Sequence, residues 1–113
     1  MLLLGCARET FTHNDKPNRH AGHDLGQATA QFALQAGALG LVLHQMAGFD
    51  AARAREVCAI PAGYEPLVMI ALGHQAEAAA LPDALRQREE APRVRRPQAE
   101  FVFGATFGDA PVF

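Results

Sequence analysis

Apolar and polar positions follow one another in blocks that predict three strands and three helices. Residues 1–7 form a continuous apolar run, which is typical of a strand buried on both faces. Residues 9–20 are polar and rich in turn-forming side chains, which indicates a loop. Residues 21–39 predict the longest helix, because apolar side chains recur there at helical spacing: Leu25, Ala28, Phe32, Ala36 and Leu39.

The remaining surface of this helix is rich in alanine and carries few charges. We therefore expect the helix to pack on most of its sides, with a close approach of neighbouring backbone at Gly26 and Gly37. Gly40 follows the last periodic position, where a residue with left-handed backbone conformation commonly ends a helix.

A second strand, a short helix and a third strand come next. The apolar run 41–46 predicts the strand, and a turn at 48–50 follows it. Asp50 is a good N-cap for a helix over 51–57. The run 66–73 is again apolar and predicts the third strand.

The last part of the chain is less regular. Pro82 is placed to begin a short helix that runs to Glu90, and Pro92 and Pro97 enclose an extended, arginine-rich stretch. Residues 98–113 are expected to form an extended tail. The order of elements predicts an α+β fold, with a small sheet flanked by helices, and one partial domain over residues 1–113.

The N-terminal run has no strand before it in this sequence. We therefore expect residues 1–7 to form an edge strand with unpaired backbone groups and exposed apolar side chains. The motif Leu4-Gly5-Cys6 resembles a lipoprotein cleavage box, but no basic segment precedes it and the apolar stretch is short, which favours the strand.

Composition narrows the classes of protein. The chain is 50% hydrophobic and only 19% charged, which argues against intrinsic disorder and suggests that some apolar surface meets a partner. A net charge of −2 gives no general attraction to nucleic acid or to anionic membranes. No segment has the ~20 consecutive apolar residues of a membrane span, so we expect a cytoplasmic protein.

Few side chains offer independent chemistry. Cys6 and Cys58 lie in apolar runs without metal-ligand spacing, which favours buried, reduced thiols. His20 and His23 are spaced to share a helix face, but no third ligand lies nearby, so we predict no metal site. The chain contains no serine, which excludes a serine nucleophile.

Three blocks, in order, resemble the nitroreductase family. The first is His13-Asn14-Asp15-Lys16-Pro17-Asn18-Arg19 with the long helix that follows it. The second runs from Ala38-Leu39-Gly40-Leu41 into His44-Gln45-Met46-Ala47-Gly48-Phe49-Asp50. The third joins Ile60-Pro61-Ala62-Gly63-Tyr64-Glu65-Pro66 to Leu81-Pro82 and Ala91-Pro92-Arg93-Val94-Arg95-Arg96-Pro97. The resemblance lies in the order and spacing of the blocks.

This resemblance implies a homodimeric α+β protein that holds flavin mononucleotide (FMN) at the subunit interface. Members of the family pass hydride from NAD(P)H to the flavin, and then to small-molecule acceptors such as nitroaromatics or quinones. The family's helical segment with a flavin-binding arginine and serine, and its asparagine-containing loop, have no match in this sequence. The resemblance therefore implies the C-terminal half of such a subunit, truncated at the N-terminus.

Arg93 and Arg95 are the candidate ligands for the flavin phosphate. In an extended chain, side chains two residues apart lie on the same side, so the two guanidinium groups are placed to clamp a phosphate together. The resemblance supports this role, whereas Arg96 points to the other side. The alternative is a solvated run of charge continuing from Arg86 and Arg88.

Ala47 and Gly48 are the candidate contacts to the flavin ring, through backbone groups, by the same resemblance. Glycine permits a close approach of backbone to a flat ligand, although a plain turn between strand and helix explains Gly48 equally well. The flavin performs the redox step in this family, so we assign no catalytic side chain and interpret His44 as structural. His13 and Asn14 are placed on the partner's side of the interface, and Phe101, Phe103 and Phe107 are expected to anchor the tail on the partner.

Two other functions remain open at this point. The chain could be a non-catalytic remnant that keeps the fold without binding flavin tightly. It could also be a small partner-binding α/β domain whose arginine-rich stretch docks on an acidic surface. Retention of Gly48, Arg93 and Arg95 favours the flavin oxidoreductase, while the unmatched N-terminal segments favour the remnant.

Overall fold

The computed structural model describes residues 1–110 and divides the chain into two compact units, Met1–Gln75 and Ala76–Phe113. The first unit contains β1 (Leu2–Arg8), α1 (Ala21–Ala38), β2 (Val42–Met46), α2 (Ala51–Val57) and β3 (Tyr64–Gly73). The second contains the 3-10 turn η1 (Ala78–Ala80), α3 (Asp83–Glu89) and the 3-10 turn η2 (Gln98–Glu100). The predicted order of strands and helices is confirmed.

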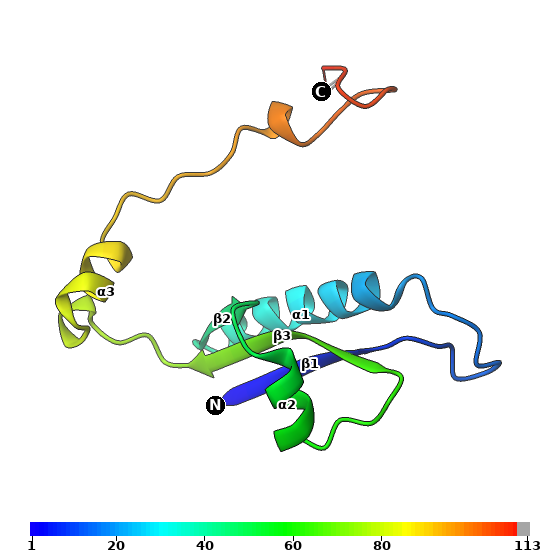
Figure 1. Ribbon diagram of the computed structural model, residues 1–113. Helices are drawn as coiled ribbons and strands as arrows, with labels where there is room; N and C mark the ends of the chain where they lie inside the picture. Colours follow the sequence, from blue (N-terminus) through cyan, green and yellow to red (C-terminus); the bar gives the residue numbers. More distant parts are fainter. Residues whose placement is uncertain (111–113) are drawn as a thin grey trace. The chain divides into compact units, whose positions relative to one another are not determined.

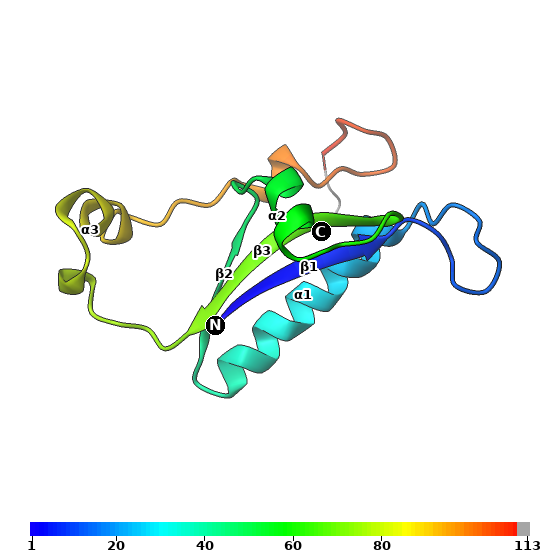
Figure 2. The same ribbon diagram turned by 60° about the horizontal axis from the view of Figure 1, so that its bottom comes forward.

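The three strands form one antiparallel sheet in the order β1-β3-β2. β3 lies in the centre, and Met69 pairs with Leu4 of β1 on one side and with Met46 of β2 on the other. α1 covers one face of the sheet and α2 lies on the opposite face (Figures 1 and 2). Because every strand pair is antiparallel, the first unit is an α+β fold, as predicted.

A bulge interrupts the ladder between β1 and β3 at Gly5 and Cys6, next to Pro66. The backbone N–H of Leu72 donates to Met1 O at 2.9 Å, whereas beyond the bulge the N–H of Glu9 donates to Gly63 O at 2.9 Å, so the bulge changes which residues of β3 face β1. Pro66 lies at this change, opposite Cys6, and has no N–H to donate. A bulge is one of the few places where a sheet accepts proline, which explains how β3 continues through Pro66 to Tyr64.

β1 is an edge strand, as predicted, but it is not buried on both faces. Leu2 is 62% exposed, and Ala7 is the one buried residue of the strand. Across residues 1–110, the buried hydrophobic residues are Ala7, Ala36 and Ile70, and no large side chain is fully buried. The described chain therefore has a very small hydrophobic core of its own.

α1 follows the predicted apolar stripe only in part. Ala36 of the stripe is buried and Leu25 and Phe32 are half-buried, whereas Ala28 and Leu39 are exposed; Thr29, outside the stripe, is buried. Leu25 contacts β1 at Gly5, where a methyl group would lie 3.3 Å from Leu25 Cδ1. This contact places Leu25 of the predicted stripe against the sheet, although periodicity alone did not reveal its partner Gly5.

The expected close packing around α1 is also wrong within the described chain. A methyl group at Gly26 or Gly37 would meet no atom within 4 Å. Gly40, in contrast, has a φ of 72°, the left-handed conformation predicted for the end of this helix.

The segment 98–113 is not extended throughout. It begins with η2, and Asp109 N donates to Thr106 O at 3.1 Å in a turn further along. The rings of Phe103 and Phe107 stack at a tilt with centroids 4.4 Å apart, while Phe101 is exposed. The last three residues of the predicted tail lie outside the described residues, and the anchoring of the tail on a partner remains a prediction. No helix among residues 1–110 has the length and apolar character to cross a membrane.

Two glycine substitutions test the packing of α1 on the sheet. Gly5→Ala places its methyl group 2.7 Å from Val68 Cγ1 and 3.3 Å from Leu25 Cδ1, so we expect a loss of about 1–3 kcal/mol in the free energy of unfolding. Gly26→Ala should instead stabilise the protein by about 0.5–1 kcal/mol, because alanine favours the helix and meets no neighbour. Denaturation in urea at one protein concentration measures both, and equal effects of the two substitutions would contradict this packing.

Candidate functional site

The turn between β2 and α2 carries the two predicted ring contacts. Ala47 and Gly48 follow Met46, and Phe49 N donates to Ala47 O at 3.0 Å. Asp50 then begins α2, and its Oδ1 accepts from Arg53 N at 2.9 Å, which confirms the predicted N-cap. The central strand and the Asp50 cap therefore hold this turn at both ends.

Gly48 is exposed, and the surrounding protein does not require glycine there. Its φ is not positive, unlike those of Gly40 and Gly63, and a methyl group on it would meet no atom within 4 Å. Its N–H makes no hydrogen bond to another described residue. The space next to Gly48 is thus open, with an unpaired backbone donor, which suits the close approach of a flat ligand.

Arg93 and Arg95, the predicted phosphate ligands, lie in the second unit on the irregular segment between α3 and η2. Both are exposed. Arg93 makes no hydrogen bond or ion pair within the described chain, and Arg95 Nη1 donates only to the neighbouring Val94 O, at 3.3 Å. Arg96 is different, since its Nε lies 3.0 Å from Glu100 Oε2. Arg96 thus differs from the predicted pair in having a carboxylate partner, while the side to which each arginine points remains a prediction.

Most other arginines are already paired with a carboxylate. These ion pairs are Arg8–Asp15, Arg53–Glu56, Arg55–Glu65, Arg86–Asp83 and Arg96–Glu100. Arg93 and Arg95 have no such carboxylate among residues 1–110, and neither does Arg88 on α3. Their charge remains available to an anionic ligand, and Arg88 provides a matched control.

Ala47 and Gly48 belong to the first unit, and Arg93 and Arg95 belong to the second. The predicted convergence of the two pairs on one ligand therefore stays a prediction. The role of each pair rests on its own surroundings and on similarity to known proteins.

The histidines show no common site. His44 is exposed on β2, and His23 Nε2 lies 2.7 Å from Gln27 Nε2 on α1. His13 Nε2 lies 2.9 Å from Asn14 Nδ2 in the loop after β1. Within residues 1–110, no group of three side chains is arranged to hold a metal ion.

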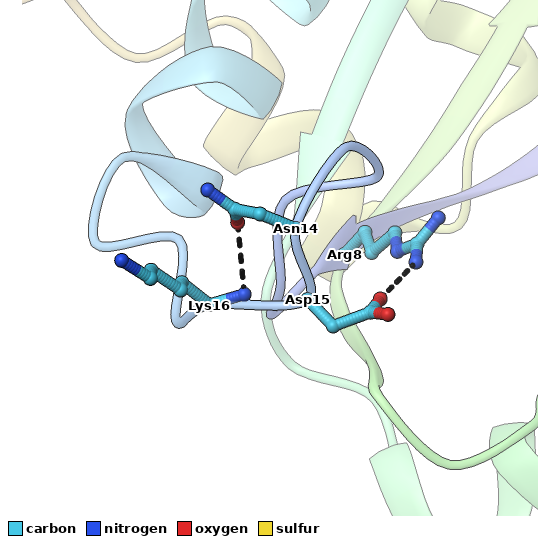
Figure 3. A network of polar contacts seen from close by, with 4 residues as sticks. All are labelled: Arg8, Asn14, Asp15 and Lys16. Carbon is cyan, nitrogen blue, oxygen red and sulfur yellow. Dashed lines mark hydrogen bonds and ion pairs between the residues drawn. The ribbon is translucent and has the colours of Figure 1, made fainter.

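The loop that carries the first family-like block is shaped by its own polar side chains (Figure 3). Asn14 Oδ1 accepts from Lys16 N at 3.0 Å, and Asp15 adopts a left-handed conformation with a φ of 53°. Arg8 Nη2 lies 3.3 Å from Asp15 Oδ1 and ties the loop to the end of β1. These residues thus have a local structural role, and their place on a partner's interface remains a prediction.

The prediction of two buried thiols is wrong for Cys58. Cys58 ends α2 and is exposed, whereas Cys6 on β1 is half-buried. Burial raises the pKa of the Cys6 thiol, and the nearby Cys58 thiol raises it further, against the opposing effect of Arg55. Cys58 also lines an apolar groove beside α2, which the sequence analysis missed because its walls come from three separate elements.

Comparisons with known proteins agree with this architecture. An uncharacterised 15.4 kDa protein encoded in the ask 5′ region of Mycolicibacterium smegmatis is 34% identical over 108 residues, which span 96% of this chain and 71% of that protein. A solved oxidoreductase containing FMN is 32% identical and superposes with a TM-score of 0.84 over 96% of this chain. No protein-family model matches the sequence.

A nitroreductase family protein from Clostridium difficile 630 superposes with a TM-score of 0.65 over 93% of this chain; its 24% identity supports the fold alone. The antiparallel sheet, with α1 and α2 on opposite faces, is thus a nitroreductase-type α+β fold. Its solved structural neighbours are thus nitroreductase family proteins, together with the FMN-containing oxidoreductase.

The chain spans only part of its solved relatives. It covers 56% of the FMN-containing oxidoreductase and 59% of the Clostridium difficile protein. The resemblance predicts that the chain corresponds to the C-terminal half of such a subunit. The activity of a whole subunit is therefore a proposal for this chain.

Proposed function

We propose that this chain is a flavin-binding oxidoreductase module that binds FMN and passes hydride from NAD(P)H to nitroaromatic or quinone-like acceptors. The observation that carries the proposal is the similarity to a solved FMN-containing oxidoreductase, with a TM-score of 0.84 and 32% identity over 96% of this chain. The surroundings of the two predicted residue pairs support it independently.

Ala47 and Gly48 are assigned to the flavin ring. The backbone of Gly48 is exposed, and its N–H makes no hydrogen bond within residues 1–110. An added methyl group there would meet no atom within 4 Å. A flat heterocycle gains dispersion and hydrogen-bond contacts from such a backbone turn, whereas a larger side chain at this position would hold it away.

Arg93 and Arg95 are assigned to the phosphate of FMN. Both guanidinium groups lack a carboxylate partner in the described chain, and each presents a planar set of donors that matches phosphate oxygens. Bound FMN would supply the hydride-transfer chemistry. The chain's part is to hold the cofactor and to orient it.

We further propose that the working unit is a homodimer. The described chain buries only Ala7, Ala36 and Ile70 among its hydrophobic residues, and Leu34 on α1 is 76% exposed. A fold with so little buried apolar surface gains stability by covering α1 with a second subunit.

Removing the arginine pair tests the assignment of the phosphate. We expect Arg93→Ala with Arg95→Ala to weaken FMN binding about 10²- to 10⁴-fold, because each charge-assisted hydrogen bond contributes about 1.5–3 kcal/mol and 1.4 kcal/mol is tenfold in affinity. Titration followed by flavin fluorescence measures the dissociation constant. Riboflavin, which lacks the phosphate, should bind the double variant and the original protein equally.

Two further variants separate the ring from the phosphate. Arg88→Ala removes another arginine without a carboxylate partner, outside the predicted pair, and should leave FMN affinity unchanged. Gly48→Val should weaken FMN and riboflavin alike while changing stability by less than about 0.5 kcal/mol, because the position is exposed and a Cβ there meets no atom within 4 Å. A protein that purifies colourless and binds neither flavin would support the non-catalytic alternative instead.

Hydride transfer is tested in two steps, first to the flavin and then onward to an acceptor. Under anaerobic conditions, NADPH or NADH should bleach the visible absorbance of the FMN-loaded protein, and a quinone should restore it. If dithionite bleaches the flavin and neither nicotinamide does, the proposed electron donor is wrong.

Sedimentation equilibrium tests the homodimer. The expected mass is twice the 12.1 kDa of one chain, and Leu34→Asp should shift the equilibrium toward monomer because it places a charge on the exposed face of α1. A monomer at all accessible concentrations would refute the proposal.

A further inference from the structure

The two cysteines of the sequence lie on facing elements of the first unit. Cys6 belongs to β1, and Cys58 is the residue that ends α2. A methyl group on Gly5 would lie 3.3 Å from Leu25 Cδ1, so this position of β1 faces α1. Because side chains alternate along a strand, the next residue, Cys6, points to the opposite face, which carries α2 (Figures 1 and 2).

The end of α2 opens onto the same strip of β1. Cys58 lines the apolar groove beside α2 together with Leu2 and Leu4, which share the face of Cys6 by the same alternation. β1 itself runs regularly through this region, because the bulge places its extra residue, Leu67, on β3. Both thiols are therefore directed into the space between β1 and α2.

An ion pair holds the last turn of α2 close to Cys6. Arg55 Nη2 lies 2.8 Å from Glu65 Oε2, and Arg55 Nη1 donates to Pro61 O at 3.2 Å. Glu65 precedes Pro66, the residue of β3 that pairs with Cys6. Cys58 follows Arg55 by three residues, which is the spacing of neighbours on one side of a helix. The contact of Arg55 thus brings Cys58 toward the position of Cys6.

The two thiols differ in their access to solvent. Cys58 is exposed and Cys6 is half-buried. Burial raises the pKa of the Cys6 thiol, the nearby Cys58 thiol raises it further, and Arg55 opposes both. Cys58 therefore meets a dissolved oxidant first, while Cys6 stays protonated behind it. Within residues 1–110 no third ligating side chain joins them, so the pair is not a metal site.

We propose that Cys6 and Cys58 form a reversible disulfide within one chain when a peroxide or a small disulfide oxidises the protein. With hydrogen peroxide, the Cys58 thiolate attacks one oxygen, the O–O bond breaks, and a sulfenic acid forms while hydroxide leaves and takes up a proton. The Cys6 sulfur then attacks the Cys58 sulfur, the S–O bond breaks, and water leaves. The pair loses two protons and two electrons, and a dithiol reverses the step.

The disulfide would tie the end of α2 to β1. In the reduced chain, α2 contacts β3, and none of its residues is buried. So short and exposed a helix is free to shift by the small distance that disulfide geometry demands. The closed loop contains α1 and β2, so the bond restricts most of the first unit in the unfolded state. This inference does not depend on the flavin proposal.

Oxidation of the full chain at low protein concentration tests the disulfide. With oxidised glutathione, we expect both thiols to become unreactive and the mass of the chain to fall by two hydrogen atoms. The chain should remain a monomer on a non-reducing gel, and dithiothreitol should restore both thiols. The oxidised protein should also unfold about 10 °C higher than the reduced protein.

Single-cysteine variants separate the two roles. Cys6→Ser should keep a stable glutathione adduct on Cys58, because the thiol that would displace glutathione is missing. Cys58→Ser should leave the half-buried Cys6 reduced under the same conditions. A glutathione adduct that persists on Cys58 in the original chain would mean that Cys6 does not reach it, and would overturn the proposal.

Two arginine variants locate the origin of the approach. Arg55→Ala removes the ion pair to Glu65 and should slow disulfide formation severalfold. Arg86→Ala removes the Arg86–Asp83 ion pair, also 2.8 Å long, in the second unit and should leave the rate unchanged. Equal rates in the two variants would refute the positioning by Arg55. Thiols lost only together with a doubling of the covalent mass would identify a bond between chains and refute the disulfide within one chain.

Discussion

The pairing of β3 with a strand on each side is the constraint on which the rest of the first unit depends. Met69 pairs with Leu4 of β1 and with Met46 of β2, so these two residues lie on either side of the same position of the central strand. This pairing fixes the position of Met46, the last residue of β2, and hence of the Ala47–Gly48 turn and of α2 with its Asp50 cap. The predicted ring contacts and the groove beside α2 are thus both consequences of one central ladder.

The sequence predicted the elements much better than their surroundings. The bounds of α2, its Asp50 cap and the left-handed Gly40 follow from local preferences that need no tertiary information. The apolar stripe of α1 was right in part, since Leu25 packs near Gly5 and Ala36 is buried, but the partner Gly5 was not predicted because a contact between residues so far apart leaves no mark in the helix periodicity. The start of β3 was placed two residues late because Pro66 normally argues against a central strand.

Burial was the least predictable property, and the reason is physical. Apolar composition was interpreted as burial for residues 1–7 and for Cys58, yet Leu2 and Cys58 are exposed. Composition does not tell which apolar side chains the fold covers, because apolar atoms also make up much of the surface of a folded protein. For Arg93 and Arg95, the sequence indicated free guanidinium groups, but their convergence with Gly48 depends on long-range docking that no local pattern encodes.

Pro66 has an effect well beyond its own position in β3. Pro66 has no amide proton and lies beside the bulge at Gly5 and Cys6, and a bulge bends a strand and increases its twist. The bulge therefore changes the course of the two strands shortly before β1 ends, and the loop 9–20, whose Asp15 pairs with Arg8, follows directly. An irregularity beside one proline thus affects the direction in which the polar loop leaves the sheet.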